Sequence, residues 1–79
     1  MKIVSTNTVI FLLQQIEFYK FRQKITKIAI QQLPDSKDES YTREFRILIL
    51  QQHIQLTSEL IDIVDALFKL EMQLKEALP

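Results

Sequence analysis

Three carboxylates and one histidine are the first residues of this sequence to weigh as candidates for chemistry. Glu59, Asp62 and Asp65 fall loosely on one side of a helical wheel, as an acid/base or metal site would require. The sequence places no second cluster of candidate ligand or catalytic residues near them. The chain also has a single histidine, His53, and no cysteine. We therefore predict no catalytic residue, no metal site and no cofactor, and we interpret the carboxylates as part of a solvated face.

Basic and aromatic side chains alternate between residues 18 and 27. The basic members are Lys20, Arg22, Lys24 and Lys27, and the aromatic members are Phe18, Tyr19 and Phe21. Proteins that bind single-stranded nucleic acid use similar mixtures of positive charge and stacking rings. The whole chain balances ten basic against ten acidic residues, so it lacks a net field that would attract nucleic acid. We expect a solvated basic face with the aromatic rings in the core, and a nucleic-acid-binding regulator is the alternative function.

The composition favours a small helical protein that associates. Its 79 residues form at most one domain, and a domain of this size hides only roughly 60% of its unfolded surface. The 47% hydrophobic share is mostly Ile and Leu, and the absence of glycine argues against phosphate-binding loops and tight hairpins. The apolar run Val9 to Leu13 is too short for a signal peptide or a membrane span. We expect a cytoplasmic location.

One turn divides the chain into two long helices. Pro34 disfavours helix at Leu33, and the following Asp and Ser residues favour a turn. Ser36 with Glu39 matches a capping box, which predicts that the second helix begins near Lys37. We predict a single helical-hairpin domain over 1–79, with helices at about 8–33 and 38–78 and a turn at 34–37. In an antiparallel hairpin the longer second helix would then overhang the start of the first by about 20 Å.

The second helix carries two apolar stripes. The main seam steps by alternating fours and threes, as in a coiled coil, and comprises Ile49, His53, Leu56, Leu60, Ile63, Leu67, Leu70, Leu74 and Ala77. The second stripe is turned by about 100° and comprises Ile47, Leu50, Ile54, Ile61, Val64 and Phe68. One neighbouring helix needs only one stripe, so two stripes predict two neighbours. Asp65 and Lys69 on the remaining face predict an i, i+4 ion pair.

The apolar positions of the first helix change sides partway along. The later group is Phe18, Phe21, Ile25 and Ile28, and the earlier group of Val9, Leu12, Leu13 and Ile16 lies on roughly the opposite side. One straight helix cannot bury both groups against one partner. Either the helix breaks near Glu17, or residues 9–16 face a second molecule, and we expect the second.

These patterns predict a non-catalytic protein that binds helices. We expect the hairpin to join a second copy or another protein in a four-helix-type bundle, as an adaptor, small chaperone or assembly subunit. The predicted partner interface is Val9, Leu12, Leu13, Ile16, Leu56, Leu60, Ile63, Leu67, Leu70 and Leu74. A charge at Ile63 or Leu67 should then yield monomer or unfolded protein. No small-molecule substrate is expected.

Two amphipathic helices joined at Gln32-Leu33-Pro34-Asp35-Ser36, in a chain of this length without cysteine, resemble the small helical hairpins of bacterial type III secretion systems. These include needle subunits, whose turn also begins with proline, and the YscE-like co-chaperones that hold needle subunits unpolymerised. Needle subunits usually carry a second proline where this chain has Lys37. The resemblance implies a hairpin that grips a protein partner through one apolar side, and no single residue carries over as a contact.

Overall fold

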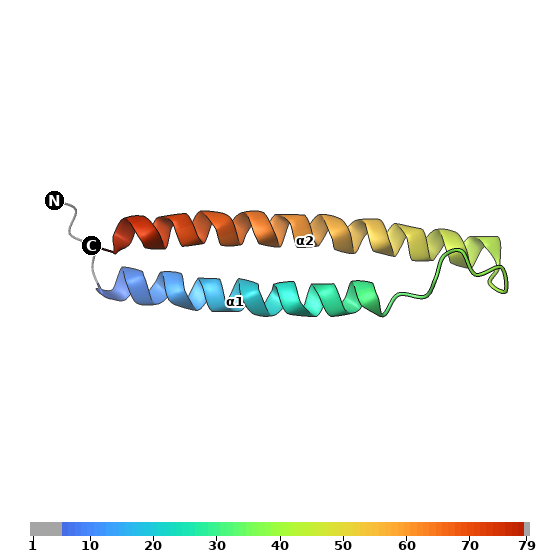
Figure 1. Cartoon of the computed structure of the whole chain (residues 1–79), viewed down its shortest axis with the longest axis horizontal. Coiled ribbons are helices and arrows are strands. Elements are labelled where there is room, and N and C mark those ends of the chain that lie inside the picture. The colour runs from blue at the N-terminus through green and yellow to red at the C-terminus, as the bar shows by residue number, and fades with distance from the viewer. Residues whose placement is uncertain (1–5, 79) are drawn as a thin grey trace.

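The computed structural model describes residues 6–78 as an all-α antiparallel hairpin (Figure 1). Helix α1 spans Thr6–Gln31 and helix α2 spans Arg43–Ala77. At 1.5 Å per residue the two helices are about 39 and 52 Å long, and together they form a rod of 63 × 15 × 13 Å. The predicted fold class is confirmed, and α1 ends within two residues of the expected boundary. The predicted domain also includes residues 1–5 and Pro79, which lie outside the described residues.

Helix α2 begins at Arg43, so the prediction of a start near Lys37 was wrong. Its N-cap is Thr42, which has an extended backbone, and its hydroxyl accepts a hydrogen bond from the Phe45 amide at 3.2 Å. Glu44 lies in the first turn, where the helix dipole favours a negative charge. Thr42 has no Glu or Gln three residues later, so the capping-box pattern did not mark it.

Two aspartates hold the segment before Thr42 out of the helix. The Asp35 carboxylate accepts a hydrogen bond from the Lys37 amide at 2.9 Å. The Asp38 carboxylate accepts from the Ser40 amide at 2.9 Å and from the Ser40 hydroxyl at 2.7 Å. Such local side-chain bonds compete with helical hydrogen bonding. They explain why residues 32–42 form a loop, although Ser36 and Glu39 have the spacing of a capping box.

The longer α2 extends past α1 at the loop end of the hairpin and not at the chain termini. In Figure 1 the start of α1 lies beside the end of α2, and the loop continues outward from the end of α1 beside the first turns of α2. The Arg46 Nε donates a hydrogen bond to the Ser36 carbonyl at 2.8 Å across this contact. The expected overhang at the end of α2 is therefore wrong, because the eleven-residue loop takes up the difference in helix length.

The core of the hairpin is a thin seam between the helices. Ile16, Ile63 and Leu67 form its buried centre, with Tyr19, Leu70 and Leu74 packed against them. The main seam of α2 is thus the one that faces α1, and its members from Leu56 to Ala77 are buried or half-buried. His53 is the exposed member of this seam, close to the loop.

Helix α1 is continuous through Glu17, so the predicted alternative of a break there is wrong. Its α2-facing residues step by alternating threes and fours, and they are Val9, Leu12, Ile16, Tyr19, Gln23, Thr26 and Ile30. Leu12, Ile16 and Thr26 are buried, and the others are half-buried. The early apolar group therefore faces α2 and not a second molecule, apart from Leu13, which is exposed. The prediction that Leu12 and Ile16 face a second molecule was therefore wrong, whereas Leu13 remains exposed.

Candidate interaction surface

Most of the residues predicted to bind a partner lie inside the hairpin itself. Leu12, Ile16, Ile63 and Leu67 are buried between α1 and α2. Val9, Leu56, Leu60, Leu70 and Leu74 are half-buried in the same seam, and Leu13 is exposed. This distribution corrects the predicted partner interface at Leu12, Ile16, Ile63 and Leu67, because these side chains are already buried within the hairpin.

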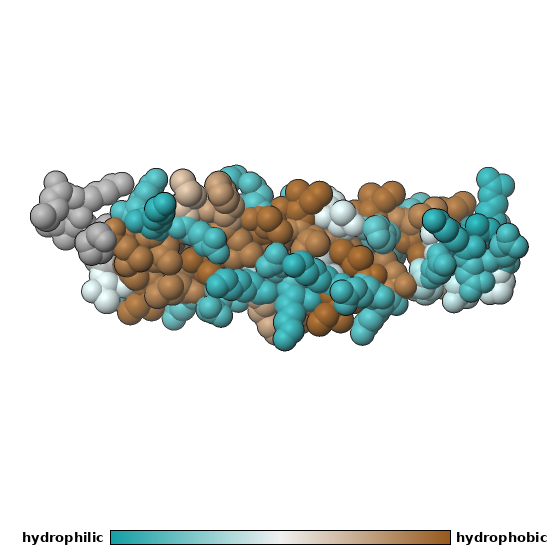
Figure 2. All heavy atoms as spheres, in the orientation of Figure 1, coloured by the Kyte–Doolittle hydropathy of each residue, from teal (hydrophilic) through white to brown (hydrophobic). Residues whose placement is uncertain are grey.

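Exposed apolar side chains outnumber buried ones within residues 6–78. Seventeen large hydrophobic residues are exposed, whereas five are buried. Figure 2 shows apolar side chains along both helices on one face of the rod, interrupted by hydrophilic groups. Single exposed apolar residues are ordinary on protein surfaces, but contiguous patches indicate binding sites. The positions of the exposed residues along each helix therefore matter more than their number.

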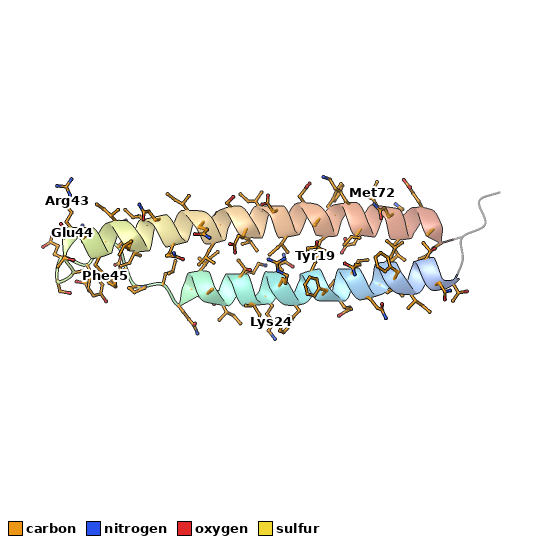
Figure 3. All side chains as sticks on the ribbon, turned by 180° about the vertical axis from the view of Figure 1, so that it is seen from behind. Tyr19, Lys24, Arg43, Glu44, Phe45 and Met72 are labelled. Carbon is orange, nitrogen blue, oxygen red and sulfur yellow. The ribbon has the colours of Figure 1, made fainter. Side chains whose placement is uncertain are left out.

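The first such patch is on α1, and we call it the α1 outer face. It consists of Phe18, Phe21, Ile25 and Ile28. Phe18 is 53% exposed and Phe21 is 61% exposed, so the expectation that these rings lie in the core was wrong. Their spacing of three and four residues places them on the side of α1 that faces away from α2. Tyr19 is the aromatic residue that points toward α2 (Figure 3).

The second patch runs along α2, and we call it the α2 stripe. Its members are the residues of the predicted second stripe, and all six are exposed: Ile47, Leu50, Ile54, Ile61, Val64 and Phe68. A shallow depression of about 340 Å³ lies along it, between Ile54 and Ile61. The exposed α2 stripe matches the prediction that α2 has more apolar surface than one neighbour covers.

Basic side chains border the α1 outer face. Arg22 lies over the Phe18 ring, with its guanidinium carbon 6.0 Å from the ring centroid. Lys24 points away from α2 (Figure 3), and Lys20 and Lys27 are exposed as well. None of these four side chains forms an ion pair within residues 6–78. Their charge is therefore available to an external partner.

The polar side of α2 carries the carboxylates. The Lys69 Nζ and the Asp65 Oδ2 form an ion pair at 2.9 Å, which confirms the predicted i, i+4 pair. Within residues 6–78 no three His, Cys, Asp or Glu side chains are arranged to hold a metal ion. The His53 Nδ1 lies 3.5 Å from the Thr57 hydroxyl on the next turn. Asp65 lies one helical turn from Ile61, at the edge of the α2 stripe, and its charge is balanced by Lys69.

The hollows of the described structure are small and open. One of about 250 Å³ lies between the loop and the helices, and its lining includes Leu33, Pro34, Ile49 and His53. Another of about 340 Å³ lies between Ser36 and the first turns of α2. Neither α1 nor α2 combines the length with the apolar character that a membrane-crossing helix requires. The described surface therefore offers exposed helix faces more than pockets.

Comparisons with known proteins found no matching family model, no matching curated protein and no matching solved structure. The resemblance to type III secretion hairpins accordingly remains a prediction from the sequence.

Proposed function

We propose that this chain is a non-catalytic interaction protein that binds other amphipathic helices, as an adaptor, small chaperone or assembly subunit. The observation that carries the proposal is the exposed α2 stripe, which runs for about six turns of the helix at the spacing of a helix-packing seam. A helix laid along it would place side chains between those of the stripe, as in other helix-in-groove complexes.

The energetics of a small domain support association. Burying one Val, Leu, Ile or Phe side chain fully contributes roughly 1.5–3 kcal/mol. The α2 stripe and the α1 outer face hold ten such side chains that are only partly covered. Even if a partner covered a fraction of this surface, the gain would be comparable with the whole stability of a small domain, about 5–15 kcal/mol. A bound helix would therefore stabilise the hairpin markedly.

The resemblance to type III secretion hairpins gives the proposal a biological context. A type III secretion apparatus uses small hairpins both as assembly subunits and as co-chaperones of those subunits. Either role requires a hairpin with an exposed apolar side, and this chain has one on each helix. The setting is supported by architecture and by the proline-initiated turn, and it predicts a helical protein partner.

The test replaces an exposed residue of the α2 stripe and leaves the hairpin core intact. Ile61→Glu should keep the helical circular dichroism and melting of the isolated hairpin but lower its sedimentation mass to the 9.4 kDa of one chain. Gln73→Glu adds the same charge on the polar face of α2 and should leave association unchanged. Ile63→Glu and Leu67→Glu do not serve this purpose, because both residues are buried and a charge there would unfold the hairpin.

The proposal fails if the wild-type chain sediments as a compact monomer at high concentration, melts sharply and retains no helical protein from its native host. Under that outcome the exposed apolar side chains have no partner to bind.

A second candidate function is contact with nucleic acid, and it is favoured by the exposure of Phe18 and Phe21 beside four basic side chains that form no ion pair within residues 6–78. Exposed rings can stack on bases, and lysines can neutralise phosphates. Binding of single-stranded oligonucleotides should then weaken steeply with salt, and Lys24→Glu should reduce it. A flat titration at low salt would dismiss this candidate.

A further inference from the structure

Charge is divided unequally between the two helices. The chain as a whole is neutral, but α1 carries four basic residues and one acidic residue, Glu17, which gives it a net charge of +3. Helix α2 carries four basic and six acidic residues, a net charge of −2. Because the helices lie side by side, one long side of the rod is positive and the other is negative (Figure 1). An anionic surface would therefore attract the rod with α1 toward it.

Basic side chains border the α1 outer face on both of its edges. At about 100° per residue, this face spans about 80° of the helix circumference, from Phe18 at one edge to Ile28 at the other. Arg22 lies about 40° beyond Phe18, and Lys24 lies about 40° beyond Ile28. Lys24 points away from α2 in Figure 3, and the Arg22 guanidinium lies over the Phe18 ring. The acidic Glu17 lies at the Lys24 edge, where it is outnumbered by the basic residues.

The α1 outer face is a ridge and not a groove. It lies on the side of a single helix that faces away from α2, and none of the three hollows described above is lined by its residues. Helix-in-groove binding requires an apolar groove. Stacking on bases requires aromatic rings, whereas Ile25 and Ile28 supply half of this face. A lipid bilayer yields to a ridge and requires neither feature.

We propose that the α1 outer face binds the surface of an anionic lipid bilayer, with α1 lying parallel to that surface. This inference goes beyond the proposed helix-binding function, because it concerns another surface and another class of partner. The apolar side chains of the face enter the boundary between headgroups and acyl chains. The basic side chains at its edges reach back to the lipid phosphates. The α2 stripe lies on the helix farther from the membrane and stays free for a helical partner.

Flotation with lipid vesicles tests the proposal. The wild-type chain should float with vesicles of equal parts phosphatidylcholine and phosphatidylglycerol but not with vesicles of phosphatidylcholine alone, and salt should weaken the binding. Each Lys or Arg near an anionic surface strengthens partitioning roughly fivefold, so Lys24→Gln should weaken it by about that factor. Lys75→Gln is the matched control, because it removes the same charge from an exposed position of α2 and should bind like the wild-type chain.

A single tryptophan identifies the face in contact with lipid. The chain has no tryptophan, so Phe21→Trp reports on the α1 outer face and Ile61→Trp reports on the α2 stripe. Anionic vesicles should shift the emission of Phe21→Trp to shorter wavelength and should leave that of Ile61→Trp unchanged. The two positions are exposed to similar extents, 61% and 63%. The circular dichroism of each variant checks that the hairpin is folded.

Four outcomes would overturn the proposal. Wild type that floats with neither kind of vesicle does not bind membranes, and equal flotation with both kinds removes the role of charge. An emission shift in Ile61→Trp but not in Phe21→Trp would assign the membrane to the α2 stripe. Binding of single-stranded oligonucleotides that Lys24→Gln weakens, without flotation, would assign the basic side chains to nucleic acid. The helix-binding function is tested without lipid, through Ile61→Glu, so the two proposals can fail separately.

Discussion

The Nε atom of Arg46 donates a hydrogen bond to the backbone carbonyl of Ser36 at 2.8 Å, across ten residues of chain. This bond joins the middle of the loop to the first turns of α2. It is part-buried, and it lies where α2 extends beyond α1. The loop is therefore fastened to the helix surface that the shorter α1 does not reach.

Removing this bond should loosen the loop without unfolding the hairpin. We expect Arg46→Ala to lower the free energy of unfolding by about 1–2 kcal/mol, the range for a bond with a charged donor that is partly solvated. Hydrogen exchange of the amides of residues 36–41 should accelerate more than exchange in the middle of α2. Arg43→Ala is the matched control, because Arg43 is exposed, and equal effects of the two changes would contradict the assigned role.

Two isoleucines separated by one residue distinguish the hairpin core from the outer surface. Ile63 is 3% exposed and Ile61 is 63% exposed. We expect Ile63→Val to cost about 1 kcal/mol of hairpin stability, because it removes a buried methylene group. Ile61→Val should have almost no effect on the melting of the isolated hairpin. Chemical denaturation at concentrations below the onset of association measures both, and the reverse ranking would show that the helix faces are wrongly assigned.

The N-cap of α2 can be located by mutation. Thr42→Ala should reduce the free energy of unfolding by about 1 kcal/mol, because the Phe45 amide loses its acceptor. Ser36→Ala should be close to neutral, since the Ser36 hydroxyl caps no helix in this structure. Thermal melts of the two variants provide the comparison. A larger loss for Ser36→Ala would restore the earlier helix start that the capping-box pattern predicts.

The loop also has a titration signature. Hydrogen bonds from the Ser40 hydroxyl and amide lower the pKa of the Asp38 carboxyl below its usual value of 3.8. A lowered pKa in the folded state stabilises the loop above pH 3.8, and this contribution is lost as the pH falls through the folded pKa. An NMR titration of the Asp38 carboxyl should have its midpoint below 3.8, and Ser40→Ala should raise that midpoint. An unchanged midpoint in Ser40→Ala would contradict the assigned cause.

The helical periodicity of the sequence determined most of the fold. Pro34 fixed the place where α1 must end, because the residue before a proline is driven out of the helical region. The repeat from Leu56 to Leu74 determined that α2 has a seam for a neighbouring helix, and the second stripe showed that apolar surface would remain outside it. These features depend only on the spacing of residues within one helix, which can be read from the sequence.

Only the tertiary structure decided which side of α1 is buried. Phe18 and Phe21 are more apolar than Gln23 and Thr26, yet the polar pair faces α2 and the rings face outward. Because Leu12 is buried and Ile16 packs on Ile63 and Leu67, a straight helix must continue the same line through Tyr19, Gln23 and Thr26. Turning the rings inward would require a break near Glu17. The continuity of one helix thus overrides the local preference of its second half.

The start of α2 likewise could not be predicted from spacing alone, because helical hydrogen bonds compete there with local side-chain hydrogen bonds. Ser36 and Glu39 have the pattern of a helix start, but Asp35 and Asp38 bind nearby amides, and Arg46 holds the loop against α2. The sequence by itself determined two helices, one reversal and an excess of apolar surface. The assignment of that surface to the α1 outer face and the α2 stripe required the packed hairpin, because burial depends on how two helices meet along their whole length.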